Sequence, residues 1–398
     1  MTKPSGSEML VVGGGIGGLA TALAAARSGW SVRVLERSTS FGEIGAGIQL
    51  APNATRFLAQ LGLLEQIVDV GVLPRRLVLR NAVSGMELTA LDLGDGFLAA
   101  YGAPYVVLHR GDLLAIMVDA CTRHPDISLE ACRDVTEVSP TPDAVAVDCA
   151  GGIRYSAGAV VGADGLWSTI RRRFSDDEPI CSGFVSYRGA VPLDSVAEHP
   201  TLDEVVAWIG PGLHFVQYPL RRTELYNQVA VFRSDEYFAG EDDWGNPDEL
   251  DRRFATTCPQ IRAALPALRR DNRWPMYDRE PIPKWTDGRV ALVGDAAHPM
   301  LQYLAQGACQ AFEDAAALGT ALRRHTPGGA ATDVPAAFSA YEQARRAPAT
   351  RVQQTARVWG DIWHVDGVGA LLRDELLTQR AGDDRRHIDW LYGAPAPA

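Results

Sequence analysis

The sequence predicts an α/β protein in which a Rossmann-like nucleotide-binding domain is combined with an antiparallel β-sheet domain and C-terminal helices. A glycine-rich turn joins an apolar strand to a helix near the start of the chain, and short alternating segments fill roughly residues 180–280. Helical periodicity dominates from residue 334 onward. A length of 398 residues, with 46% hydrophobic and 22% charged residues, fits a folded chain of about two to three domains.

The first part of the chain is interpreted as a nucleotide-binding core that starts with one βαβ unit. Short runs of β-branched and leucine residues predict strands, and the alanine-rich or amphipathic stretches between them predict helices. Such alternation is typical of a parallel sheet. The expected elements are a strand at 9–12, a turn at 13–18, a helix at 19–28, a strand at 32–35, helices at 52–68 and 112–121, and strands at 144–148 and 159–162.

The middle of the chain changes to alternating segments separated by glycine and proline, which predict an antiparallel sheet. A later strand then returns the chain to the first domain. The expected elements are strands at 184–191, 205–209, 213–218 and 227–232, covering helices at 250–270, a strand at 289–293, a helix at 307–322, a linker at 327–333 and helices over 334–355 and the Trp-rich segment that follows.

Because the chain returns to its first domain, we expect discontinuous domains. The nucleotide-binding domain is expected over 1–75, 100–180 and 275–335, the β-sheet domain over 76–99 and 181–274, and a helical segment over 336–398.

Charge and cysteine content exclude several classes of function. With a net charge of -11, the chain lacks the basic surface that nucleic-acid binding needs. The apolar run at 9–26 is too short and too rich in glycine for a signal peptide or a membrane span. The six cysteines contain no CxxC pair, which favours reduced thiols in the cytoplasm and no metal site.

The glycine-rich turn predicts dinucleotide binding. Gly13, Gly15 and Gly18 form GxGxxG between a strand and a helix, and Glu36 ends the second strand. The first glycine permits the tight turn, and the second lets backbone N–H groups approach a pyrophosphate at the helix N-terminus. The acidic residue accepts hydrogen bonds from ribose hydroxyls. The neighbouring Gly14 and Arg37 complete this candidate set, which by itself does not separate FAD from NAD.

Two further motifs decide for FAD, because an enzyme that uses only NAD does not need them. Asp164 lies in GADGLWSTIRR, and Gly294 and Asp295 lie in VALVGDAAHP; each aspartate follows a buried strand. With the glycine turn, these motifs resemble the fingerprints of the class A flavoprotein aromatic hydroxylases, the family of 4-hydroxybenzoate and salicylate hydroxylases. The resemblance implies the GR2-type, 4-hydroxybenzoate hydroxylase-like fold. It also implies that Asp295 binds the ribityl chain of FAD, and that the Asp164 motif serves both FAD and the nicotinamide nucleotide.

The same resemblance implies further contacts and partners. Arg110, in HRGDL, matches an arginine that contacts FAD, and Gly307 and Ala308 after Gln306 match the segment whose amides lie against the flavin pyrimidine ring. No second GxGxxG is present, as expected where NADH or NADPH is a transient co-substrate without its own domain. The family also implies O2 as co-substrate and a homodimer.

Three segments resemble the 3-hydroxybenzoate 6-hydroxylase subgroup more closely: HFVQYPL with YNQVAVF, WPMYDREPIPKW, and HPMLQYLAQGACQAFEDA. Salicylate hydroxylases usually carry proline where this chain has Gln302. The resemblance implies that His214 and Gln302 are catalytic. A histidine with a pKa near neutrality polarises the phenolic proton, which makes the ring more electron-rich and a better acceptor of oxygen. Tyr218 and Tyr105 are candidates for lining the pocket and binding a carboxylate, and Arg188 is a weaker one.

The resemblance therefore implies a monooxygenase that converts 3-hydroxybenzoate to 2,5-dihydroxybenzoate. A salicylate-type or amino-substituted hydroxybenzoate hydroxylase of a biosynthetic pathway is the first alternative. The second is a flavin-binding protein without oxygenase activity, in which His214 and Gln302 are structural. Each aspartate motif alone would equally fit a helix cap, and a packed tyrosine needs no ligand.

Overall fold

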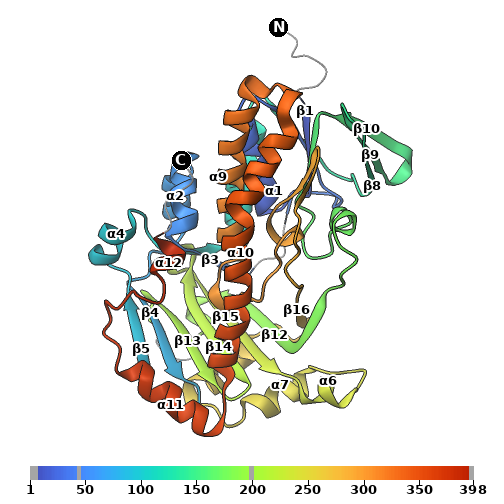
Figure 1. Cartoon of the computed structure of the whole chain (residues 1–398). Helices are drawn as coiled ribbons and strands as arrows, with labels where there is room; N and C mark the ends of the chain where they lie inside the picture. Colours follow the sequence, from blue (N-terminus) through green and yellow to red (C-terminus); the bar gives the residue numbers. More distant parts are fainter. Residues whose placement is uncertain (1–7, 43–45, 197–200, 394–398) are drawn as a thin grey trace.

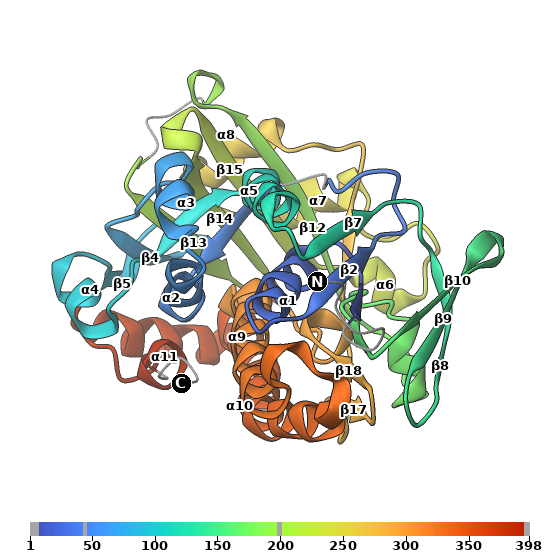
Figure 2. The ribbon, with the colours of Figure 1, turned by 90° about the horizontal axis from the view of Figure 1, so that it is seen from above.

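The computed structural model describes residues 8–42, 46–196 and 201–393, and it confirms the predicted fold class. Figure 1 shows two parts one above the other, with the nucleotide-binding sheet at the top and a larger, mainly antiparallel sheet below. The long helix α10 (Val334–His364) runs beside both parts. Seen from above in Figure 2, the small sheet β8–β10 projects from one side of the molecule and α11 (Gly367–Thr378) lies on the opposite side.

The upper sheet has six strands in the order β17-β18-β11-β1-β2-β7, all parallel except β17. After Glu8, every residue of β1 is buried, as expected for a parallel strand covered on both faces. The strands are β1 (Glu8–Val12), β2 (Ser31–Leu35), β7 (Ile127–Glu130), β11 (Ala159–Gly162), β17 (Thr286–Asp287) and β18 (Val290–Leu292). Helices α1 (Ile16–Ala26), α5 (Arg110–Arg123) and α9 (Gly307–His325) pack together beside this sheet.

The lower sheet has seven strands in the order β16-β12-β15-β14-β13-β4-β5, in which only β13 and β4 pair in parallel. Helices α7 (Pro247–Phe254) and α8 (Pro259–Ala264) cover one face, where Phe215, Phe232 and Phe254 pack together. Because side chains alternate along a strand, His214 points to the opposite face. The strands are β4 (Arg76–Asn81), β5 (Glu87–Asp92), β12 (Ile180–Pro192), β13 (Glu204–Gly210), β14 (Leu213–Leu220), β15 (Leu225–Arg233) and β16 (Trp274–Asp278).

Smaller elements connect the two parts. A two-stranded sheet of β3 and β6 leads into α5, and therefore places Arg110 at the start of that helix. The remaining elements are β3 (Gly47–Leu50), β6 (Val106–His109), β8 (Val135–Pro140), β9 (Val145–Cys149), β10 (Ile153–Ala157), α2 (Pro52–Gln60), α3 (Leu64–Val70), α4 (Asp95–Tyr101), α6 (Asp235–Ala239) and α12 (Asp389–Tyr392), with short 3-10 turns η1 to η9 between them.

The structure refines three expectations. The domain boundary expected at residue 274 falls within β16, which pairs with β12; we therefore propose that the sheet domain extends to Asp278. The covering helices expected over 250–270 are α7 and α8, and Pro259 starts the second of them. The Trp-rich segment is helical as expected, and it forms the last part of α10, which continues to His364.

A buried polar network ties α9 to α10 and to the turn after β18. The Asp314 carboxylate accepts hydrogen bonds from the Gly294 amide (2.9 Å), from Arg345 Nε (2.9 Å) and from His298 Nε2 (2.6 Å). Burial opposes ionisation of Asp314, but His298 and Arg345 hold its pKa below the usual value. Arg345 also donates to Glu313 Oε2 and Gln310 Oε1, both at 2.6 Å.

Replacing Arg345 should destabilise the protein strongly. Arg345→Met leaves the Asp314 carboxylate buried without its cation, and loss of one partner of a buried pair costs about 3–5 kcal/mol. We expect a lower midpoint of unfolding in urea, followed by circular dichroism. Arg324→Met, at an exposed position of α9, is the matched control and should leave the midpoint unchanged. Equal midpoints for both variants would contradict the structural role of the network.

Candidate active site

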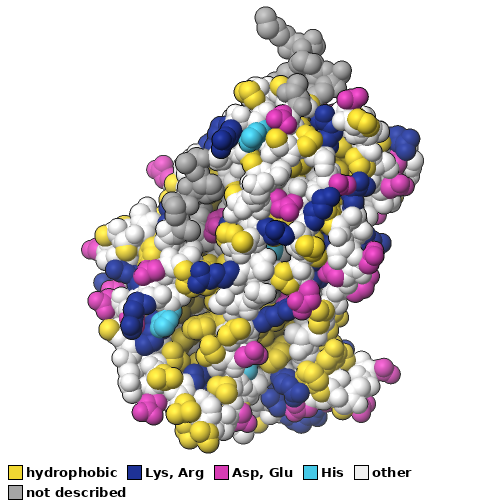
Figure 3. Space-filling view, viewed as in Figure 1, with side chains coloured by type: hydrophobic (Ala, Val, Ile, Leu, Met, Phe, Trp, Pro, Cys, Tyr) yellow, Lys and Arg dark blue, Asp and Glu magenta, His cyan; other side chains and the backbone are white. Residues whose placement is uncertain are grey.

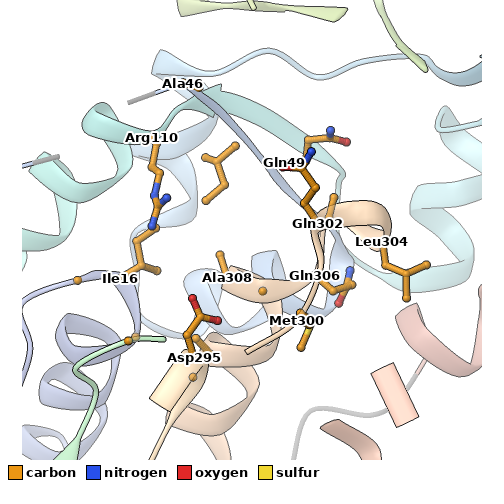
Figure 4. Close-up of a pocket in the computed structure, with 18 of the residues that line it drawn as sticks. Ile16, Ala46, Gln49, Arg110, Asp295, Met300, Gln302, Leu304, Gln306 and Ala308 are labelled. Carbon is orange, nitrogen blue, oxygen red and sulfur yellow. The ribbon is translucent and has the colours of Figure 1, made fainter. Parts of the chain in front are cut away.

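One elongated cavity of about 940 Å³ joins the two sheets. It starts at the glycine turn after β1, passes the N-terminus of α9 and ends against the face of the lower sheet that carries His214. Figure 4 shows side chains from the turn, from β3, from α5 and from the start of α9 pointing into this space. Of the sequence candidates, the cavity is lined by Gly13, Gly14, Gly15, Glu36, Arg37, Tyr105, Arg110, Asp164, His214, Tyr218, Gly294, Asp295, Gln302, Gly307 and Ala308.

Gly18 is the one candidate outside this lining. Its role is packing, because a Cβ there would overlap the carbonyl oxygen of Gly13. Helix and turn can therefore approach each other only with glycine at this position.

The glycine turn leaves space at the N-terminus of α1. Gly13 adopts φ +108°, which favours glycine, whereas Gly15 has φ -75° and a Cβ on it would meet no atom within 4 Å. No side chain caps the helix, and its first turn has no acidic residue. The N-terminal amides thus face the cavity and fit a pyrophosphate.

Glu36 is held beside this turn. Its carboxylate accepts hydrogen bonds from the Gly14 amide at 2.7 Å and the Ser38 amide at 2.8 Å. Burial opposes ionisation, but these two N–H donors lower the pKa of Glu36 below its usual value. A charged acceptor is therefore fixed where a ribose would follow the pyrophosphate.

Asp164 mainly organises its own turn. Its carboxylate accepts hydrogen bonds from the Ser168 hydroxyl and from the amides of Thr169 (2.8 Å) and Ile170 (3.2 Å). Burial raises its pKa. A direct role in binding a nucleotide stays a prediction for this residue.

Asp295 directs its carboxyl group into the cavity, and Arg110 points toward the same space from the other side (Figure 4). Protein surrounds the carboxyl group although the cavity gives it access to solvent, and this burial raises its pKa. A carboxyl group in this position can accept hydrogen bonds from the hydroxyls of a polyol chain.

The start of α9 forms another part of the cavity wall. Ala305 adopts φ +51°, unusual for alanine, and thereby turns the chain so that the helix begins at Gly307 with its amides toward the cavity. The Gln306 side chain points away and accepts a hydrogen bond from Asn53 Nδ2 at 2.9 Å. The positive end of the helix dipole then faces the space where the resemblance places the flavin pyrimidine ring, and it favours negative charge there.

His214 forms a pair with a second histidine. It is 1% exposed, and its Nδ1 lies 2.8 Å from Nε2 of His364, the last residue of α10. Burial and His364 lower the pKa of His214 well below the usual value. The expectation of a pKa near neutrality is therefore wrong: a charged imidazolium lacks solvation here, so His214 is a neutral acceptor or donor.

Gln302 lies beside an arginine of the lower sheet. Its Oε1 accepts a hydrogen bond from Arg188 Nη2 at 3.1 Å, and both residues line the cavity. Arg188 also lies close enough to Tyr218 to act electrostatically on its hydroxyl, while burial raises the pKa of that tyrosine. The structure thus places one cation near both the amide of Gln302 and the phenol of Tyr218.

Tyr105 and Tyr218 meet at Gln49 of β3. The Tyr105 hydroxyl donates to Gln49 Oε1 at 2.6 Å, and Tyr218 is also a hydrogen-bond partner of Gln49. Both tyrosines are 3% exposed and line the cavity, so their packing and a ligand contact are compatible.

Three residues with a place in the site, His364, Gln49 and Arg171, are not among the candidates that the sequence predicts. Arg171 is fully buried and donates to the carbonyl oxygens of Ala296 (3.0 Å) and Ala297 (2.8 Å), so it fastens the Asp164 motif to the Asp295 motif. Arg171 belongs to the GADGLWSTIRR motif, which is a signal that could have identified it, whereas Gln49 lies in no recognisable motif. His364 stands in the quoted WGDIWH segment, but no local pattern shows that it reaches His214.

The cavity fits FAD on observations of this structure alone. Open space at Gly15, uncapped amides at two helix starts and the carboxyl groups of Glu36 and Asp295 form one continuous surface. A family model described as an FAD binding domain matches residues 7–356.

The chain belongs to the FAD-dependent aromatic hydroxylase family. It is 37% identical over 396 residues to the 3-hydroxybenzoate 6-hydroxylase of Polaromonas naphthalenivorans, covering 98% of this chain and 97% of that protein. It is 35% identical over 390 residues to the 3-amino-4-hydroxybenzoate 2-monooxygenase of Streptomyces cremeus, covering 98% and 95%.

Solved structures of other proteins show the same fold. HpxO of Klebsiella pneumoniae, complexed with FAD and uric acid, matches with a TM-score of 0.84 and 27% identity over 97% of this chain and 96% of that chain. A salicylate hydroxylase substrate complex matches with a TM-score of 0.80 and 24% identity, over 99% and 97%. No group of three or more His, Cys, Asp or Glu side chains within the described ranges could hold a metal ion.

Filling the space at Gly15 should block FAD without unfolding the protein. A Cβ at position 15 meets no protein atom within 4 Å and the φ of Gly15 is allowed for valine, so the side chain of Gly15→Val would extend into the cavity. We expect normal circular dichroism and a loss of flavin absorbance at least tenfold after gel filtration. Gly96→Val, on exposed α4, is the control and should retain its flavin. Full flavin content in Gly15→Val would show that the pyrophosphate lies elsewhere.

Proposed function

We propose that this hydroxylase converts 3-hydroxybenzoate, O2, NAD(P)H and a proton to 2,5-dihydroxybenzoate, water and NAD(P)⁺. The observation that carries the proposal is the buried His214 at the end of a cavity that begins at the dinucleotide turn. The similarity to 3-hydroxybenzoate 6-hydroxylases over nearly the whole chain supports the same reaction.

The residues at the glycine turn and at the start of α9 would hold FAD. Gly13 to Gly15 would bind the pyrophosphate, Glu36 a ribose and Asp295 the ribityl chain. When bound and reduced by NAD(P)H, FAD activates O2 for transfer of one oxygen atom to the ring. The amides of Gly307 and Ala308 would stabilise negative charge on the reduced ring.

Arg188 would anchor the substrate carboxylate. Its guanidinium donates a hydrogen bond to Gln302 and acts electrostatically on Tyr218, so these two neutral side chains can hold the same carboxylate by hydrogen bonds. A cation at one end of the ring fixes which carbon faces the flavin. This selection of one ring position is what a regiospecific hydroxylase requires.

His214 would accept the hydrogen bond of the phenol. Its Nδ1 is engaged by His364, so Nε2 is the nitrogen that remains for a ligand in the cavity. A neutral imidazole that draws the phenolic proton raises the electron density of the ring at the para carbon. Enclosure by the sheet and α10 limits water around the reacting atoms.

An amino-substituted hydroxybenzoate is the second candidate substrate. The identity to a 3-amino-4-hydroxybenzoate 2-monooxygenase is nearly as high as the identity to a 3-hydroxybenzoate 6-hydroxylase.

The decisive experiment is NADH oxidation by the FAD-loaded protein against a panel of hydroxybenzoates and aminohydroxybenzoates, with products identified by mass spectrometry. We expect one 2,5-dihydroxybenzoate per NADH from 3-hydroxybenzoate. Stoichiometric product only from an amino-substituted ring would replace this proposal, and no aromatic product at all would favour a flavin-binding protein without oxygenase activity.

Replacing His214 should uncouple the reaction. His214→Ala removes the acceptor of the phenolic proton, so hydroxylation should fall roughly 10²–10⁴-fold. NADH oxidation stimulated by substrate should persist, with hydrogen peroxide released in place of product. His325→Gln, outside the cavity lining, is the control and should stay coupled. Unchanged coupling in His214→Ala would remove it from catalysis.

We propose a homodimer that uses α11 as part of its interface. Val368, Leu371, Leu372 and Leu376 of this helix are 56–71% exposed, and Figure 3 shows hydrophobic side chains over the lower end of the molecule. A contiguous apolar surface of this kind is typical of a contact with another protein.

No helix in the described ranges is long and apolar enough to cross a membrane. Six free thiols support a cytoplasmic location.

A charge on α11 should weaken this dimer. Leu371→Glu would bury a carboxylate in the interface, so light scattering after gel filtration should give the mass of one chain in place of two. Ile153→Glu, on β10 at the other side of the molecule, is the matched control and should leave the dimer intact. A dimer in both variants would place the interface elsewhere.

A further inference from the structure

Among the described residues, His364 makes the one side-chain hydrogen bond that the structure records for the His214 ring. The two rings lie 21° from parallel with centroids 5.1 Å apart, so they meet through the edges that carry Nδ1 of His214 and Nε2 of His364. His364 is half-buried and is not part of the cavity lining, whereas His214 is buried and lines the cavity. One histidine therefore lines the cavity, and the other lies behind it and keeps part of its surface in solvent.

The position of His364 is fixed from several sides. Its ring stacks on Phe184 of β12 at 4.6 Å, and Tyr303 lies 5.2 Å away edge-on. Its backbone carbonyl accepts a hydrogen bond from the Gly212 amide at 3.0 Å, directly before β14. This bond ties the end of α10 to the strand that carries His214.

The surroundings of the pair disfavour a charge on either ring. His214 faces His364, Trp363 and Tyr303, and no carboxylate is recorded against either ring within the described residues. Burial, together with repulsion from Arg373 of α11, lowers the pKa of His364 to about 3. A base that keeps the phenolic proton as an imidazolium is therefore unfavourable here.

We infer that His364 is a positioning residue that passes the phenolic proton from His214 to solvent. The phenolic O–H bond breaks and its proton binds Nε2 of His214, while the proton on Nδ1 of His214 moves to Nε2 of His364. His364 then releases the proton on its own Nδ1. One proton enters and one leaves, both rings are neutral before and after, and the reverse sequence protonates the product.

The inference rests on the proposed function, because it requires a phenol at His214. It assigns to the pair two tasks that a single histidine could not combine. His364 fixes the tautomer of His214 with a free lone pair at Nε2, and it opens a path for the proton that avoids a charged buried ring.

The test measures proton release on binding, without NADH. The FAD-loaded protein is mixed with 3-hydroxybenzoate in weak buffer with a pH indicator, and formation of the phenolate is followed by its absorbance. We expect phenolate and released proton to appear together in the unmodified protein. In His364→Ala both should slow at least tenfold and recover with added imidazole, which replaces a proton carrier but not a packing contact. His325→Gln is the control and should behave as the unmodified protein.

Two outcomes would overturn the relay. Proton release in His364→Ala within twofold of the unmodified protein would show another exit, and a slow variant that imidazole does not restore would reduce His364 to packing.

If the unmodified protein hydroxylates the ring with its phenol still protonated on binding, the relay fails and the proposed function stands. If the unmodified protein binds no hydroxybenzoate and yields no product, the proposed function fails, and the ¹⁵N shifts of the two histidines still decide the pair. A proton fixed on Nδ1 of His214 that is lost in His364→Ala would support the assigned tautomer, and unchanged shifts would refute it.

Discussion

The candidate site depends on the buried carboxylate of Asp314. It binds the Gly294 amide in the turn that carries Asp295, and it pairs with Arg345 of α10. The turn, α9 and α10 therefore form one rigid unit, and the N-terminus of α9 keeps its direction toward the cavity. An ion pair buried this deeply is stable only because every partner is present. The same α10 ends at His364, so the cofactor end and the substrate end of the cavity share one support.

The combination of the two sheets explains how one cavity serves two purposes. The parallel sheet ends in turns whose amides suit a pyrophosphate, which is the usual ligand edge of such a sheet. The lower sheet offers the cavity a largely apolar face, in which the polar side chains of His214, Arg188 and Tyr218 are set. A flavin bound along the first part would meet an aromatic acid held by the second. Few polar groups in an apolar cavity give a ligand one orientation.

Much of this arrangement could be predicted from the sequence because the decisive signals are local. GxGxxG before a helix and Glu36 after the next strand specify a dinucleotide turn by themselves, and alternation in residues 213–218 specifies a strand. The His214–His364 contact could not be predicted, because it joins residues 150 positions apart through the register of β14 and the length of α10. The expected pKa of His214 differs from the lowered one for the same reason, because burial and the neighbouring His364 ring are consequences of packing. The start of β16 also escaped notice, since a short edge strand containing Pro275 has weak alternation.

A crystal structure of the protein with FAD and 3-hydroxybenzoate is the most direct test of these assignments. We expect the flavin along the glycine turn with its pyrimidine ring at Gly307 and Ala308. We also expect the carboxylate at Arg188 and the phenolic oxygen within hydrogen-bond distance of His214 Nε2. A ring bound with its carboxylate toward His214, or a phenolic oxygen with no contact to that histidine, would contradict the assignment of the base and with it the proposed position of oxygen transfer.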